Sequence, residues 1–75
     1  MLAYVLVKAR VGDAMGVRDR LRGQPGIEAA DVITGPYDLV VRVRASSLND
    51  IAKIVLNTLQ GTPGLETTVT CPVVD

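Results

Sequence analysis

The sequence predicts an α+β domain with the element order βαββαβ, and three observations support this prediction. Four segments of the 75-residue chain have the apolar patterning of strands, and two segments between them carry the apolar stripe of a helix. The β-α-β pattern occurs twice, because Pro25-Gly26-Ile27-Glu28 recurs as Pro63-Gly64-Leu65-Glu66. Only a turn-rich segment, 34–38, separates the two copies. Such units joined by a hairpin give the ferredoxin-like arrangement, an antiparallel sheet of order 4-1-3-2 with both helices on one face.

The first half of the chain is expected to form a strand, a short helix and a second strand. Residues 2–9 are apolar on both sides, which is typical of a central strand. Asp13 is the expected N-cap of a helix over 14–23, where apolar residues fall on one stripe. The strand predicted over 27–33 contains two acidic residues, as edge strands often do.

The second half repeats this pattern after a tight corner. The segment 34–38 is short enough to favour an antiparallel hairpin into a strand over 39–45. A helix is expected over 47–60, and Ser47 followed three residues later by an aspartate resembles a capping box. The fourth strand is expected over 65–74.

One face of this sheet would have no helix over it. Strict alternation along the strands predicts that Cys71 faces the helices as a small core residue. It predicts that the uncovered face carries Tyr4, Leu6, Lys8, Val40, Arg42, Thr68 and Thr70. This mixture is more apolar than the surface that a monomeric domain usually exposes to water. A chain of this size buries only about 60% of its unfolded surface, so burying more apolar surface against a partner would stabilise it. We therefore expect a dimer through this face. The alternative is an ordinary sheet with one face exposed to solvent.

Composition excludes several classes of function. Eight basic and eight acidic residues give no net charge, which argues against a nucleic-acid binder that relies on phosphate contacts. The chain has no histidine and one cysteine, so the usual zinc ligands and the usual general base are missing, and no metal or cofactor is expected. Leu2–Val7 is too short to cross a membrane and lacks the features of a signal peptide, which predicts a soluble cytoplasmic protein.

The corner and the second half resemble a known family. The run 34–43 (Thr-Gly-Pro-Tyr-Asp-Leu-Val-Val-Arg-Val), then Pro63-Gly64-Leu65 and Thr68-Val69-Thr70, resembles the effector-binding RAM domain of the Lrp/AsnC transcriptional regulators. The first half fits this resemblance too, so it covers essentially the whole chain. It implies a regulatory module that binds small molecules, usually amino acids. It also implies dimers through the sheets, often rings of dimers, and effector sites at subunit interfaces near the hairpin.

The resemblance also bears on partners. The helix-turn-helix domain that precedes the RAM domain in full-length members is not in this sequence. We therefore expect a stand-alone version that does not bind DNA directly. A full-length Lrp/AsnC paralogue is a candidate partner for it.

The resemblance places ligand binding at Gly35, Tyr37, Asp38, Thr68 and Thr70. Each has a structural alternative. Gly35 either supplies a special backbone conformation or lets a ligand carboxylate approach backbone N–H groups. Asp38 either caps the turn through its own backbone or receives the α-ammonium group of a ligand. Tyr37 is a hydrophobic lid or a pocket wall with a hydroxyl group, and the threonines are good strand formers in any case.

Two other functions compete with a regulatory module. A small dimeric isomerase or cofactor-free monooxygenase could use the same sheet, but it would need a proton-handling group between the helices and the sheet. The inward positions are apolar and histidine is absent, so no catalytic residue and no enzyme activity are predicted. A structural oligomer without an effector is the third alternative.

Overall fold

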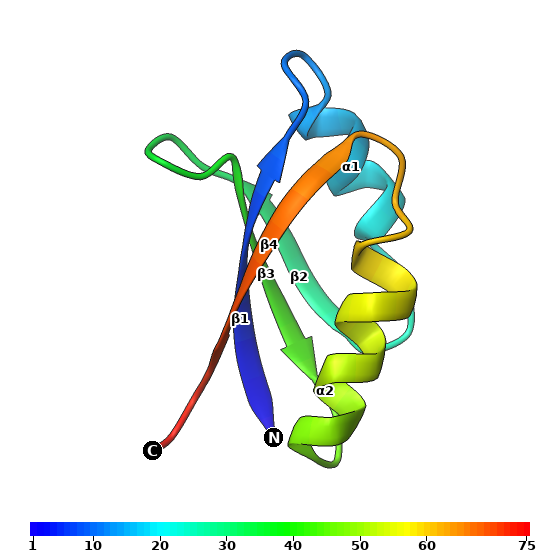
Figure 1. Ribbon diagram of the computed structural model, residues 1–75, viewed down its shortest axis with the longest axis vertical. Helices are drawn as coiled ribbons and strands as arrows, with labels where there is room; N and C mark the ends of the chain where they lie inside the picture. Colours follow the sequence, from blue (N-terminus) through cyan, green and yellow to red (C-terminus); the bar gives the residue numbers. More distant parts are fainter.

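The computed structural model describes all 75 residues and shows a four-stranded antiparallel sheet with two helical segments packed on one face (Figure 1). The strand order is β2-β3-β1-β4, which is the predicted order 4-1-3-2 read from the opposite edge. The fold prediction is therefore confirmed. The elements are β1 (Leu2–Ala9), α1 (Ala14–Leu21), β2 (Ile27–Val32), β3 (Leu39–Arg44), α2 (Leu48–Ile54), the π-helix η1 (Val55–Leu59) that continues α2, and β4 (Leu65–Pro72).

The core lies between the helices and the sheet and contains apolar side chains only. The central strands β1 and β3 supply every second residue to it, as their alternating patterns predict. Two residues of α1 and three of the second helical segment complete this layer. The fully buried side chains of these elements are Ala3, Val5, Val7, Leu39, Val41, Val43, Val17, Leu21, Ile51 and Leu59.

Both predicted N-cap residues occupy the N-cap positions, but only one of them caps its helix with a side-chain hydrogen bond. Asp13 occupies the N-cap position of α1, but its side chain makes no capping hydrogen bond, and α1 ends at Leu21. Ser47 caps α2 as predicted, because its Oγ accepts a hydrogen bond from the backbone N–H of Asp50 at 3.1 Å. The Asp50 carboxylate accepts from the Ser46 hydroxyl at 3.1 Å instead of returning to Ser47. Only half of the predicted capping box is formed.

Both copies of the Pro-Gly repeat lead into a β-bulge. In β2, Ile27 pairs with Val43 and Ala29 pairs with Arg42, so Glu28 is an extra residue on its strand. In β4, Leu65 pairs with Ala9 and Thr67 pairs with Lys8, so Glu66 is the extra residue at the equivalent place of the second copy. The repeat is therefore preserved at the level of strand register.

The bulge at Glu66 overturns the predicted faces of β4. Thr68 pairs with Val7 and Thr70 pairs with Val5, and both partners are fully buried under the helices. Directly paired residues share a face, so both threonines lie on the helix side. Cys71 pairs with the exposed Tyr4 and is itself exposed on the uncovered face. The predicted faces of Thr68, Thr70 and Cys71 were therefore wrong, because one extra residue in the strand moves every later side chain to the opposite face.

The uncovered face has an apolar row across its middle. Val69, Leu6 and Val40 lie side by side in register on β4, β1 and β3. The next row contains Tyr4, whose ring centroid lies 6.0 Å from the Arg42 guanidinium carbon. No other element of the chain covers this face, and it carries both exposed apolar side chains, such as Val69, and an exposed charged one, Lys8.

No helix in the chain has the length and apolar character required for a membrane span.

Candidate functional site

The corner between β2 and β3 is fastened to the neighbouring strand β1. The loop 34–37 extends past the end of the sheet (Figure 1) and is closed at its base by a bond from Ile33 N–H to the Asp38 carbonyl at 2.9 Å. The Asp38 N–H donates to the Val7 carbonyl at 2.8 Å. The Asp38 carboxylate then accepts, through Oδ2, from the Ala9 N–H at 2.8 Å. Asp38 therefore holds the corner against β1 through both its backbone and its side chain.

This contact is not the expected cap of its own turn, and the ligand-binding role of Asp38 stays a prediction. Its carboxylate binds an N–H group of a strand 29 residues away in sequence, and not its own turn. Only one carboxylate oxygen is used, because Oδ1 takes part in no hydrogen bond or ion pair within the chain. Asp38 is half-buried, so the free oxygen belongs to a side chain whose position is already fixed. A fixed carboxylate with an unused oxygen is well suited to receive a cationic group.

The corner also presents unused backbone donors. Gly35 has a φ of +148°, which side chains other than glycine rarely adopt, and a Cβ at this position would meet no atom within 4 Å. The backbone N–H groups of Thr34, Gly35 and Tyr37 donate no hydrogen bond within the chain. Lys8 adds a positive charge, since its Nζ donates to the Pro36 carbonyl at 3.2 Å. The sequence did not single out Lys8 for this place.

The two threonines lie away from this corner. Thr68 Oγ1 accepts a weak hydrogen bond from Gln60 Nε2 at 3.4 Å. With Gln60 it lines a hollow of about 450 Å³ between η1 and the start of β4. Thr70 lines a different, mostly apolar groove of about 410 Å³ between β4 and α2. None of the hollows in the single chain is lined by both a threonine and a corner residue, so the five predicted residues form two groups.

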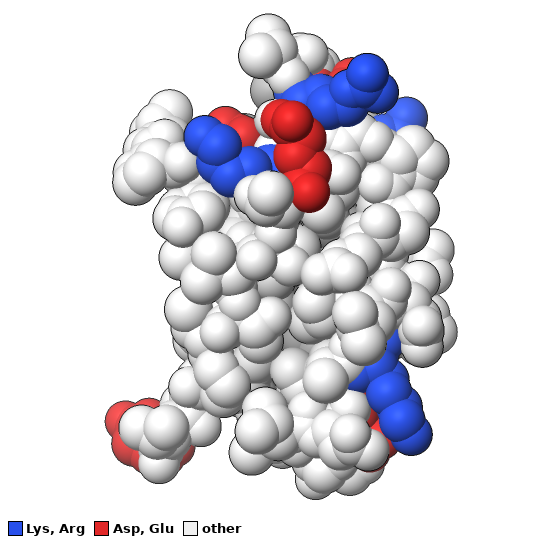
Figure 2. Space-filling model, viewed as in Figure 1, with Lys and Arg blue, Asp and Glu red and all other residues white.

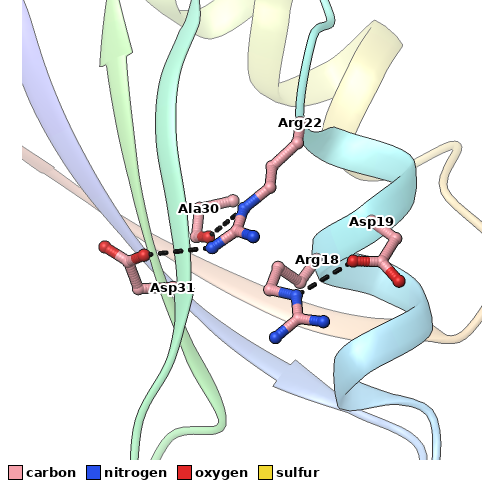
Figure 3. A network of polar contacts seen from close by, with 5 residues as sticks. All are labelled: Arg18, Asp19, Arg22, Ala30 and Asp31. Atoms are coloured by element: carbon pink, nitrogen blue, oxygen red, sulfur yellow. Dashed lines mark hydrogen bonds and ion pairs between the residues drawn. The ribbon is translucent and has the colours of Figure 1, made fainter.

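Charged residues are paired mainly at the edges of the molecule. The face that carries β4 and α2 is uncharged across its middle (Figure 2). At the β2 edge, Arg22 reaches from the end of α1 to the Ala30 carbonyl at 3.0 Å and to Asp31 at 3.3 Å (Figure 3). In Figure 3, Arg18 likewise pairs with the adjacent Asp19 on α1, at 3.0 Å. Only the Arg22 contacts attach the end of α1 to β2, and ion pairs at the surface such as these contribute little stability each.

Glu28 is the most heavily paired acid of the chain. Its carboxylate lies 2.6 Å from Arg44 Nε and 3.1 Å from Arg42 Nε, so both arginines are paired within the chain. The hydrogen bond from Arg44, aided by the charges of both arginines and opposed by partial desolvation, holds the pKa of Glu28 below its usual 4.5. The same hydrogen bond raises the pKa of Arg44.

The lowered pKa of Glu28 predicts a pH-dependent contribution to stability. The unfolded chain takes up a proton at this residue near pH 4.5 and the folded chain only at lower pH, so the contribution is complete above pH 4.5 and is lost as the pH falls through the folded pKa. The difference in free energy of unfolding between wild type and Glu28→Gln, from urea titrations at pH 7 and pH 3, should therefore shrink at pH 3. An equal difference at both values would contradict the ion-paired role.

Comparisons with known proteins agree with this architecture. The family described as the Lrp/AsnC ligand binding domain matches residues 2–75. The HTH-type transcriptional regulator FL11 of Pyrococcus horikoshii is 34% identical over 70 residues, which are 93% of this chain and 46% of the relative. The chain thus spans less than half the length of this curated relative.

Solved structures show the same fold. The crystal structure of TTHA0845 from Thermus thermophilus superposes with a TM-score of 0.91 at 26% identity, covering 99% of this chain and 92% of that one. The transcriptional regulator NMB0573 of Neisseria meningitidis, solved as a complex with L-Met, gives a TM-score of 0.86 at 22% identity over 99% of this chain and 49% of that one. The match over residues 2–75 covers nearly the whole chain, and the chain therefore belongs to the Lrp/AsnC family, whose ligand binding domain it spans.

Proposed function

We propose that this chain binds an amino acid at the hairpin corner and acts as a regulatory module that responds to it through oligomerisation. The observation that carries the proposal is the chemistry of the corner. Unused N–H groups at Gly35 and Tyr37 stand close in sequence to the free carboxylate oxygen of Asp38. Backbone N–H groups suit a carboxylate, and a carboxylate suits an ammonium group, so the corner offers both partners that the α-carbon substituents of an amino acid require.

Oligomerisation would bring the two groups of predicted residues together. Thr68 and Thr70 lie on the helix side of their own chain, whereas the corner extends from the end of the sheet. A ligand that contacts Thr70 as well as the corner would therefore take the corner from one copy and Thr70 from another. This arrangement supports an effector site at a subunit interface. It would also make effector binding change the strength of assembly, because a ligand held by two copies stabilises their contact.

The uncovered sheet face is the proposed dimer interface. Its apolar row of Val69, Leu6 and Val40 and the exposed Tyr4 are the kind of surface that a small domain buries against a partner. A second copy would supply a matching apolar row. We further propose that the assembled module works in the cytoplasm, binds no DNA itself, and acts on a full-length paralogue. The relatives are transcriptional regulators, and we propose no catalytic activity.

A calorimetric panel of the free amino acids tests the proposal. At least one should bind to the wild type, and Asp38→Asn should weaken it by about 10- to 150-fold. This range corresponds to the roughly 1.5–3 kcal/mol of a hydrogen bond to a charged group. The asparagine retains an oxygen for the Ala9 N–H, so the fold should be kept.

Asp19→Asn is the matched control, because Asp19 is an exposed aspartate on α1 that pairs only with its neighbour Arg18. It should leave the affinity unchanged. The absence of any heat or thermal shift across the whole panel would overturn the proposed function, and equal losses in both variants would remove Asp38 from the site.

A further inference from the structure

The equivalent glutamates of the two Pro-Gly repeats have different surroundings. Glu28 and Glu66 both occupy the extra position of a β-bulge. Glu28 is paired with two arginines of β3, at 3.1 and 2.6 Å. Glu66 is exposed and makes no hydrogen bond or ion pair within the chain. The glutamate of the first copy is therefore paired with cations of its own chain, and the glutamate of the second copy is not.

The missing partners of Glu66 are present in the sequence but are not paired with it. Val5–Arg10 echoes Leu39–Arg44, so Lys8 and Arg10 hold the places that the two arginines hold in the first copy. Lys8 is turned to the hairpin corner, where it donates to the Pro36 carbonyl. Arg10 makes no side-chain hydrogen bond or ion pair. The corner thus leaves the second glutamate without the cation that its counterpart has.

Glu66 lies in a hollow suited to a cation. It is the only charged side chain lining the hollow of about 450 Å³ that also contains Thr68, and the other lining residues are Gln60, Leu65 and Thr67. Two hydroxyl groups and an amide oxygen are further acceptors there. An ammonium group has three donors and no acceptor, and a guanidinium group has five donors. The hollow therefore matches a cationic group better than an anionic or apolar one.

We propose that Glu66 recognises a side-chain ammonium or guanidinium group of the effector, so that the effector is a basic amino acid. This inference rests on the proposed function, because the α-substituents are assigned to the corner. Asp38 binds the N–H of Ala9 from the β3 side of β1, and Glu66 bulges opposite Ala9 and Lys8 from the β4 side. Two strand spacings amount to about 10 Å. An extended basic amino acid, hydrogen-bonded at both ends, bridges a separation of that order.

The test compares L-lysine with L-norleucine, which has a similar aliphatic chain and lacks the terminal ammonium group. By calorimetry on the wild type, L-lysine should bind at least about tenfold more tightly, as expected for one charge-assisted hydrogen bond. Glu66→Gln should remove this preference and leave norleucine affinity unchanged. Glu28→Gln, which changes the same residue type at the same bulge position, should keep the preference.

The outcomes separate this inference from the proposed function. If norleucine or another neutral amino acid binds but lysine has no advantage, or if Glu66→Gln keeps the advantage, Glu66 is not the recognising group and the corner proposal stands. If no amino acid binds, both fail. Cadaverine carries two ammonium groups and no carboxylate, so it should bind more weakly than lysine. Equal binding would assign the hollow to polyamines and overturn the amino-acid proposal.

Discussion

Leu39→Ala should lower the free energy of unfolding by about 2–5 kcal/mol, because it removes a fully buried side chain of a central strand and leaves a cavity. Leu39 is the first residue of β3, directly after the corner, and it pairs with the buried Val7. For a domain of this size each kcal/mol corresponds to about 4–8 °C in Tm. A loss of about 3 kcal/mol would thus lower Tm by roughly 12–24 °C and leave part of the population unfolded.

Leu48→Ala is the matched control, since it makes the same chemical change at a leucine that is 52% exposed. Its effect on Tm should be a small fraction of that of Leu39→Ala. Differential scanning calorimetry at a fixed protein concentration measures both, because Tm depends on concentration if the chain dimerises. Equal shifts for the two variants would contradict the position of the core between the helices and the sheet.

Leu6→Asp should prevent formation of the proposed dimer and leave a folded monomer. Leu6 is the middle residue of the uncovered apolar row, with Val69 and Val40 on either side. Within one chain the aspartate would remain partly exposed, so the fold tolerates it. In a face-to-face dimer it would be buried without a partner, which costs several kcal/mol. The dimer dissociation constant should therefore rise by more than about 100-fold.

Met15→Asp controls for the added charge, because Met15 is 62% exposed on α1 and does not belong to the uncovered face. It should not change the molar mass measured by sedimentation equilibrium. If Leu6→Asp stays as dimeric as the wild type, the dimer does not use the uncovered face. A wild type that is monomeric at all accessible concentrations would contradict the proposed interface itself.

The element order and sheet topology could be predicted because they depend on local patterns that the sequence displays twice. Strands such as Leu2–Ala9 and Leu39–Arg44 alternate regularly, and the repeated Pro-Gly step marks where each second strand begins. The faces of β4 could not be predicted in the same way. The bulge at Glu66 depends on how β4 aligns with β1, and nothing in the residues 65–72 alone reveals the extra position.

The candidate site was predictable in part for the same reason. Gly35, Tyr37 and Asp38 lie together because they are neighbours in one short loop. The partner of the Asp38 carboxylate is Ala9, which only the folded sheet brings close. Thr68 belongs to the other group because of the bulge, and the role proposed for Glu66 depends on the contrast with its paired counterpart Glu28.

A crystal structure of the chain soaked with a mixture of amino acids tests the central claim most directly. The proposed function predicts one ordered amino acid at the hairpin corner, its carboxylate on the N–H groups of Gly35 and Tyr37 and its ammonium group on the free oxygen of Asp38. An amino acid bound only in the apolar groove between β4 and α2, with the corner empty, would contradict it.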